Sequence, residues 1–335
     1  MKLNLSYFNR AAITAAMVAL TLNARADAED VISRSFKVQA GGQLAVDADR
    51  GSIEIKTVDK GEAVDVQISR KATGSQAKAT KALEDHIVTT KQDGNKVEVH
   101  SEYKGPTVSG WFNSSPNLQV RYVITIPRQF DVNLKTAGGS IKVNELIGKT
   151  QVKTSGGSIT LDKIEGPVQG HTSGGSVNVA GCRGAVDVST SGGNMTLSGI
   201  EGDVNARTSG GSIKAEKITG NSVVKTSGGS VTVSGVTGSV DAGTSGGSVN
   251  AELLAQPASN CTFKTSGGSI TVALLDKAAV DVDLRTSGGR VSSDFPVTTV
   301  IQGEQSKNEI RGKVNGGGPL ITAHTSGGSV RLQKN

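Results

Sequence analysis

The sequence predicts an all-β protein: a parallel β-solenoid, similar to a single-stranded β-helix or β-roll, with about ten stacked rungs. The pattern Thr-x-Gly-Gly begins at ten positions, and every step from Thr136 to Thr244 is 18 residues. The next two steps are 21 residues each, and the last, from Thr286 to Thr325, is 39 residues. A fixed period of this length is typical of repeat proteins in which each unit stacks on the next. Right-handed winding is expected.

Apolar residues alternate within each rung and predict two strands. In the rung that begins at Thr172, the two segments are Val177–Val179 and Val186–Val188, and a period of two indicates strands with one buried face. A Ser-Gly-Gly corner and a second corner at Gly184 separate them. Glycine is expected there because it adopts positive φ without strain. The alternation also directs each repeat Thr inward, which predicts a ladder of hydrogen-bonded hydroxyls beside the corner.

The chain is expected to divide into four parts. Residues 1–26 resemble a signal peptide, with positive charge at Lys2 and Arg10, an apolar run over Ala11–Leu22 and the small-residue cleavage site Ala24–Ala26. Residues 27–135 form a β-rich N-terminal cap, residues 136–291 the regular solenoid, and residues 292–335 irregular last rungs and a C-terminal cap. The mature protein is therefore expected in the periplasm, in the medium or at the cell surface.

Charge and cysteine content exclude several classes. Of the 36 basic residues three lie in the signal segment, which leaves 33 against 30 acidic residues; this balance does not favour nucleic acid as a specific partner. No later segment is apolar enough to anchor the mature chain in a membrane. Cys182 and Cys261 fall at inward positions several rungs apart, so they are predicted to be buried free thiols rather than a disulfide.

The region before the regular repeats predicts a cap with a short helix at Gln76–Leu83 and a hairpin over Ile87–Tyr103. A degenerate copy of the corner is predicted at Arg50–Ile53. A Gly/Ser/Pro-rich loop contains Trp111 and Phe112. Two roles are open for these rings: contact with a ligand or partner, or a plug over the end of the solenoid, where unpaired strand edges need cover.

The strongest functional signal is an outward position just before each corner. Six of its ten residues are Lys or Arg and two are His. The candidate polyanion-binding residues are Lys135, Lys153, His171, Arg207, Lys225, Lys264, Arg285 and His324, interrupted by Ser189 and Gly243. Only Arg285 has an acid on its own strand, Asp283, so the stripe is expected to be poorly neutralised. The alternative is a solvated face that keeps the rod soluble.

No pattern indicates catalysis, a cofactor or a metal site. The corners lack the acids of a calcium β-roll, and no phosphate loop or nucleophile elbow is present. The four histidines, His86, His100, His171 and His324, do not pair at metal-ligand spacing. Outward acids are scattered and rings are almost absent from the repeats, which disfavours a polysaccharide-cleaving enzyme. An ice-binding face would need a uniform outward Thr array, which the repeat lacks.

The residues that carry a family resemblance are Phe36–Val38, Gly41–Leu44, Val123–Pro127 and Leu134–Thr136, followed by the Thr-Ser-Gly-Gly rungs. In these the chain resembles the putative-adhesin family of exported bacterial proteins, whose adhesin-like β-strand-repeat domains have no assigned function. The resemblance covers nearly the whole mature chain. It implies a β-solenoid in the cell envelope, and the family offers no catalytic residues to carry over.

The sequence therefore predicts a non-enzymatic, adhesin-like structural or binding module of the cell envelope. Its expected partner is an anionic polymer of the envelope or surroundings, or a surface protein. Two alternatives remain open: a carbohydrate-active enzyme in a surface groove, and an envelope-stress accessory protein that binds a partner through its caps. A local cluster of three or more convergent charged groups would favour the enzyme.

Overall fold

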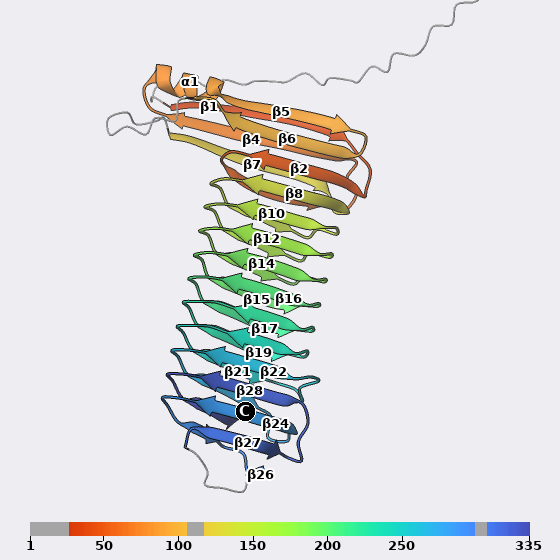
Figure 1. The fold of residues 1–335 in the computed structure, drawn as a ribbon. Coiled ribbons are helices and arrows are strands. Elements are labelled where there is room, and N and C mark those ends of the chain that lie inside the picture. Colours follow the sequence, from red (N-terminus) through yellow and green to blue (C-terminus); the bar gives the residue numbers. More distant parts are fainter. Residues whose placement is uncertain (1–26, 106–116, 299–306) are drawn as a thin grey trace, which may run out of the picture.

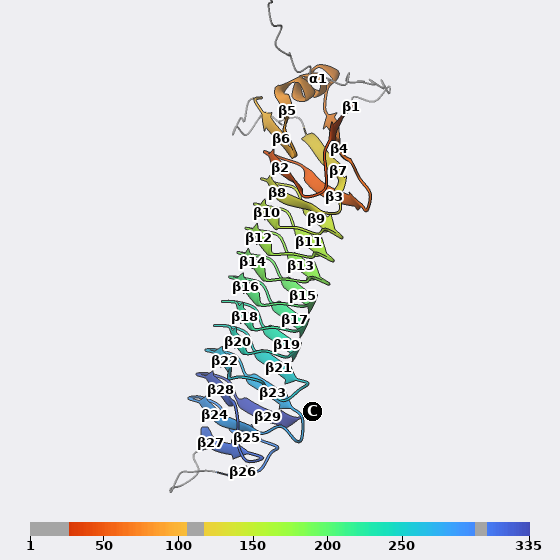
Figure 2. The same ribbon diagram turned by 90° about the vertical axis from the view of Figure 1, so that its right-hand side faces the viewer.

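The protein is a straight rod built from two facing β-sheets (Figures 1 and 2). The computed structural model describes residues 27–105, 117–298 and 307–335. One sheet has 14 strands and the other has 15. Successive rungs pair in parallel with a shift of one repeat, as in Thr150↔Val168 and Ile159↔Val177. The predicted all-β parallel solenoid is confirmed.

Each regular rung contributes one strand to each sheet. In the 15-strand sheet these are β8 (Phe130–Thr136), β10 (Thr150–Thr154), β12 (Val168–Thr172), β14 (Val186–Thr190), β16 (Val204–Thr208), β18 (Ser222–Lys225), β20 (Val240–Gly243) and β22 (Cys261–Thr265). In the 14-strand sheet they are β9 (Ile141–Asn144), β11 (Ile159–Asp162), β13 (Val177–Ala180), β15 (Met195–Ile200), β17 (Ile213–Ile218), β19 (Val231–Val236), β21 (Val249–Leu253) and β23 (Ile270–Leu274).

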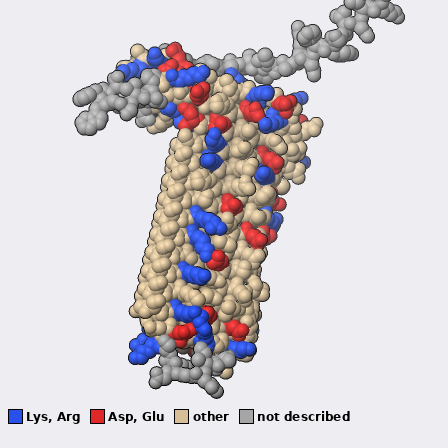
Figure 3. All heavy atoms as spheres, viewed as in Figure 1, with Lys and Arg blue, Asp and Glu red and all other residues tan. Residues whose placement is uncertain are grey.

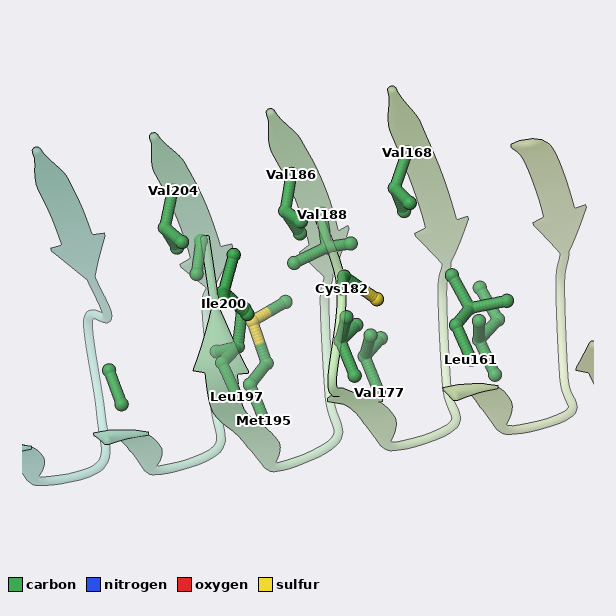
Figure 4. Close-up of a cluster of buried hydrophobic side chains, with 14 of the residues drawn as sticks. Leu161, Val168, Val177, Cys182, Val186, Val188, Met195, Leu197, Ile200 and Val204 are labelled. Atoms are coloured by element: carbon green, nitrogen blue, oxygen red, sulfur yellow. The ribbon is translucent and has the colours of Figure 1, made fainter. Parts of the chain in front are cut away.

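Small and branched apolar side chains fill the narrow space between the sheets. Val186 and Val188 of β14 lie opposite Met195 and Leu197 of β15 (Figure 4), and all four are almost fully buried. Alternation along each strand sends the intervening polar residues to the outer face. The two cysteines are buried in this core as free thiols, as predicted, and burial raises the pKa of each thiol.

The repeat threonines tie each corner to the one before it. Thr172 is fully buried, and its hydroxyl donates a hydrogen bond of 2.8 Å to the carbonyl oxygen of Gly157 in the preceding rung. The hydroxyl oxygen of Thr172 in turn accepts a hydrogen bond of 3.3 Å from the amide of Gly175. Equivalent bonds recur in the rungs of Thr154 and Thr190. The predicted ladder of inward hydroxyls is confirmed, and it satisfies backbone groups that would otherwise be buried without partners.

The glycine doublets serve a different purpose from the one expected. Among the described residues, no doublet glycine of the ten corners has a positive φ. They are glycines because the corners stack backbone on backbone: a Cβ on Gly175 would lie 2.0 Å from the carbonyl oxygen of Gly157. A Cβ on its neighbour Gly174 would be 3.7 Å from the nearest atom. Positive φ does occur at the second corner, at Gly166 and Gly184.

The N-terminal end is closed by a rung that breaks the chain order. β2 (Gly42–Ala48) and β3 (Ser52–Val58) lie between the β8–β9 rung and a rung made of β6 (Lys96–Tyr103) and β7 (Asn117–Pro127). The corner between β2 and β3 is the predicted degenerate copy, and the carbonyl oxygen of its Gly51 accepts the hydroxyl of Thr136 at 2.8 Å.

Beyond this rung lies the N-terminal cap. β1 (Asp27–Lys37) and β4 (Ala63–Thr73) extend one sheet, and β5 (His86–Asp93) forms the predicted hairpin with β6. Helix α1 (Gln76–Asp85) contacts β1, β4, β5 and β7 at the top of the rod (Figure 1). The helix and hairpin predictions are confirmed, and the helix covers the end of the core.

The C-terminal end also departs from chain order. β24 (Val280–Thr286) and β25 (Val291–Ser293) do not stack directly on β22 and β23. Instead the last segment of the chain, β28 (Leu320–Thr325) and β29 (Val330–Lys334), is inserted between the two rungs. β27 (Glu309–Val314) and β26 (Val297–Thr298) then pair antiparallel beyond β24. The inserted strands β28 and β29 therefore have a parallel partner on each side. The 15-strand sheet then ends in the short antiparallel strands β27 and β26, which disfavour pairing of its edge with another chain.

A buried polar cluster holds the helix to the cap. Arg70 forms an ion pair with Asp30 and donates hydrogen bonds to the carbonyl oxygens of Leu83 and His86 at 2.9 and 2.7 Å. His86 is only 2% exposed. Burial and the nearby Arg70 charge lower the pKa of His86 to about 4, although Asp49 opposes the shift.

The stacking role of the glycines predicts opposite outcomes for two adjacent substitutions. Gly175→Ala forces the corners apart and should lower the free energy of unfolding by about 2–3 kcal/mol. Gly174→Ala makes only an ordinary van der Waals contact, so it should change the free energy of unfolding by less than about 0.5 kcal/mol. Urea unfolding of both variants checks this. Equal losses would show that the doublet does not act through close backbone contact.

The buried imidazole predicts acid sensitivity of the cap. Because His86 resists protonation in the folded state and accepts a proton near pH 6.5 when unfolded, stability is retained above that pH. It falls as the pH drops toward 4, by about 3 kcal/mol in total. His86→Gln should flatten this part of the pH profile of unfolding, whereas His100→Gln, on an exposed outer position, should not. Parallel profiles for wild type and His86→Gln would contradict the assignment.

Candidate binding surface

The predicted stripe is one continuous column on the outer face of the 15-strand sheet. Strand register places Lys135 beside Lys153, Lys153 beside His171, and Arg207 beside Lys225. Figure 3 shows Lys and Arg in a line along the rod, bordered on one side by a wide strip without charge. We call the following residues, in spatial order, the cation column: Lys135, Lys153, His171, Ser189, Arg207, Lys225, Gly243, Lys264, His324 and Arg285.

The order at the C-terminal end differs from the order in the sequence. The inserted rung places His324 between Lys264 and Arg285. Acidic residues close the column at both ends: Asp47 pairs with Lys135 in register, and Glu309 pairs with Arg285. Neither acid belongs to a regular rung, so the repeat pattern gave no signal for them.

Part of the column is neutralised across strands, which corrects the expectation of poor neutralisation. Lys135 lies 3.4 Å from Asp47, and Lys225 forms an ion pair with Asp241 of the next strand. The stem of Lys225 crosses the open space above Gly243, 3.4 Å from the position of a Cβ there. Both acids lie on a neighbouring strand and not on the strand of the lysine, and the lysine side chain is long enough to reach them because adjacent rungs are close together.

Arg285 belongs to a tight cluster at the C-terminal end. Its guanidinium lies 2.6 Å from Asp283 and 3.3 Å from Glu309, and Nε2 of His324 lies 3.3 Å from Asp283. Arg311 contacts the same two carboxylates. Burial raises the pKa of Asp283, but hydrogen bonds and charge from Arg285 and His324 outweigh it and leave the pKa below its ordinary value.

Three cations of the column stay free. Lys153, Arg207 and Lys264 are exposed, and none of them forms an ion pair or a side-chain hydrogen bond with any residue that the structure describes. His171 is exposed and its Nδ1 lies 2.8 Å from the Ser189 hydroxyl. These free charges are the part of the stripe that can meet an external anion.

A second column runs alongside, two residues earlier in each strand, and it is polar except at Val223; Asp187 and Asp241 are among its members. It contains amides that bond to their neighbours: Gln151 to Gln169 at 2.8 Å, and Asn205 to Asp187 at 2.9 Å. A shallow hollow of about 460 Å³ lies between the two columns, lined by residues of β8, β10, β12 and β14 that include Gln151, Lys153 and His171. Another, of about 530 Å³, borders Lys264, Arg285 and His324. The face thus offers charges, amides and hydroxyls over several rungs.

Two predicted features lie outside the described residues: the loop with Trp111 and Phe112, and the signal segment 1–26. Over the residues that are described, no group of three or more His, Cys, Asp or Glu side chains is arranged to hold a metal ion. Within the same residues, no helix has the length and apolar character needed to cross a membrane.

Two facing sheets joined by stacked glycine corners, with a polar outer face, define a β-solenoid repeat protein. The chain belongs to the Toastrack DUF4097 family, whose model matches residues 41–333. The expected membership in an adhesin-like family of domains without assigned function is thereby confirmed. No curated protein matches the sequence at a significant level.

Solved structures that match the chain include putative adhesins from Bacteroides fragilis and Parabacteroides distasonis. They are 13% and 10% identical to the chain, with TM-scores of 0.36 and 0.34, and in both cases the match covers 91% of this chain and 97% of the other. A putative lipid binding protein from Parabacteroides distasonis is 13% identical with a TM-score of 0.29, covering 91% and 96%. At such identities and TM-scores these likenesses do not bear on ligand or partner.

Proposed function

We propose that the protein is a non-enzymatic, adhesin-like binding module of the bacterial cell envelope that contacts anionic polymers through the cation column. The observation that carries the proposal is the in-register line of cations, in which Lys153, Arg207 and Lys264 have no described counter-ion. A long polymer can meet all three at once, and weak contacts summed along one chain give useful avidity. Export through the segment 1–26 is part of the proposal.

A catalytic role is the second candidate, and the cluster around Asp283 and Glu309 is the observation in its favour. It meets the criterion of convergent charges beside a hollow. A glycosidase, however, needs one carboxyl group with a raised pKa as general acid. The pKa of Asp283 is lowered instead, and both carboxylates are held by Arg285 and Arg311. The cluster therefore fits an ion-paired end of the rod better than an acid catalyst.

Binding to anionic polymers should depend on this face and on salt. Wild-type protein should be retained on immobilised heparin or polygalacturonate at low ionic strength and released as salt rises, because exposed charges are screened. Lys153→Glu/Arg207→Glu/Lys264→Glu should abolish retention. Affinity chromatography with a salt gradient measures both.

The matched control reverses three cations of the opposite sheet, Lys142→Glu/Lys214→Glu/Lys217→Glu. It has the same net charge as the test variant, so retention should stay close to wild type. If wild type is not retained at low salt, or if both triple variants lose retention equally, the column is not the binding surface.

A further inference from the structure

The free cations of the column recur at a regular interval. Lys153 is on β10, Arg207 on β16 and Lys264 on β22. Three strand steps separate Lys153 from Arg207, and three more separate Arg207 from Lys264. Adjacent strands lie about 4.8 Å apart, so the free charges are about 14 Å apart. The sequence hides this spacing, because Lys135, Lys225 and Arg285 look equivalent to them until their acidic partners are located.

Each free cation has a neutral polar neighbour on the same outer face. Two residues before it lies Gln151, Asn205 or Thr262, respectively, and all three are half-buried. Each free cation and the residue two positions before it therefore present one positive charge beside one hydrogen-bonding group. Between these positions the cation column contains His171, Ser189, Gly243 and Lys225, whose charge is paired with Asp241. The second column adds one more carboxylate, Asp187, which accepts a hydrogen bond from the amide of Asn205.

The interval restricts the kind of polymer that fits. At physiological salt the Debye length is about 8 Å, shorter than the spacing, so each free cation acts on its own nearest anion. Duplex nucleic acid carries a charge about every 1.7 Å along its axis and would leave most phosphates unmatched. Neither outer column contains a Phe, Tyr or Trp on which single-stranded bases could stack.

We propose, building on the function proposed above, that the column recognises an acidic polysaccharide in which neutral sugars separate the acidic ones, with an anionic group about every 14 Å. A pyranose in an extended β-linked chain advances the polymer about as far as one rung advances the rod. One acid followed by two neutral sugars then matches three rungs. The carboxylate of the polymer meets a free cation, and the neutral sugars lie against the amides, the hydroxyls and the paired or hydrogen-bonded carboxylates of Asp241 and Asp187 between them.

Moving one cation by one rung tests the spacing without changing composition or net charge. Ser189→Arg/Arg207→Ser leaves free cations two and four rungs apart instead of three and three. The probes are oligosaccharides with two glucuronates separated by two neutral sugars or by one, at equal concentration, with binding measured calorimetrically. Wild type should bind the two-spacer probe about tenfold more tightly than the one-spacer probe, and the moved-cation variant should show the reverse preference.

Controls separate the possible failures. Ser189→Ala removes only the hydrogen bond to His171 and should keep the wild-type preference, and thermal unfolding checks that each variant is folded. If wild type binds anionic polymers but both proteins treat the two probes alike, or if duplex DNA is preferred, the spacing inference is wrong and the proposed function stands. If wild type binds neither the probes nor heparin at low salt, the proposed function itself fails.

Discussion

Close contact between backbones at the Thr-Ser-Gly-Gly corner is the constraint on which the rest of the rod depends. The second glycine of each doublet lies against the carbonyl group of the equivalent residue in the adjacent rung, on the side of the N-terminal cap. The contact is too close for any side chain to be accommodated. The buried Thr hydroxyl bonds to that same carbonyl group. Together they fix the height and register of each rung, because a slip along the strand would bring side chains into the contact.

The outer surface inherits this register. Once corners are stacked, residues at equivalent positions form straight columns, and a charge pattern written every rung becomes a line in space. Which of these charges stay free to bind an external anion then depends on acidic residues of neighbouring strands, which can be distant in sequence. Asp47 and Asp241 form ion pairs with Lys135 and Lys225, whereas Lys153 has no such partner among the described residues. A rigid array with a few free charges suits a long, repetitive ligand better than a compact one.

The fold could be predicted from the sequence because the same pattern of inward apolar residues and glycine corners recurs in every rung. The stacking order of the last rungs, the role of the doublet glycines and the ion pairs between strands could not be predicted. The rungs of Thr286 and Thr325 carry the same Thr-Ser-Gly-Gly corner, so the repeat pattern does not reveal that the second, and not the first, stacks on the rung of Thr265. The sequence predicts positive φ at the doublet glycines, whereas the structure shows close backbone contact there, because a sequence reveals a missing side chain but not the atom that occupies its place. Pairing of Lys225 with Asp241 likewise required the neighbouring strand.

Removal of one rung tests the stacked register most directly. Deletion of residues 172–189, from one repeat Thr to the residue before the next, joins equivalent positions. It should give a folded rod about 4.8 Å shorter by small-angle scattering, with a thermal midpoint near that of wild type. Deletion of residues 172–180 removes one Thr-Ser-Gly-Gly corner and β13, so that β12 runs directly into the second corner, and it should abolish cooperative unfolding. Equal behaviour of the two deletions would contradict the account.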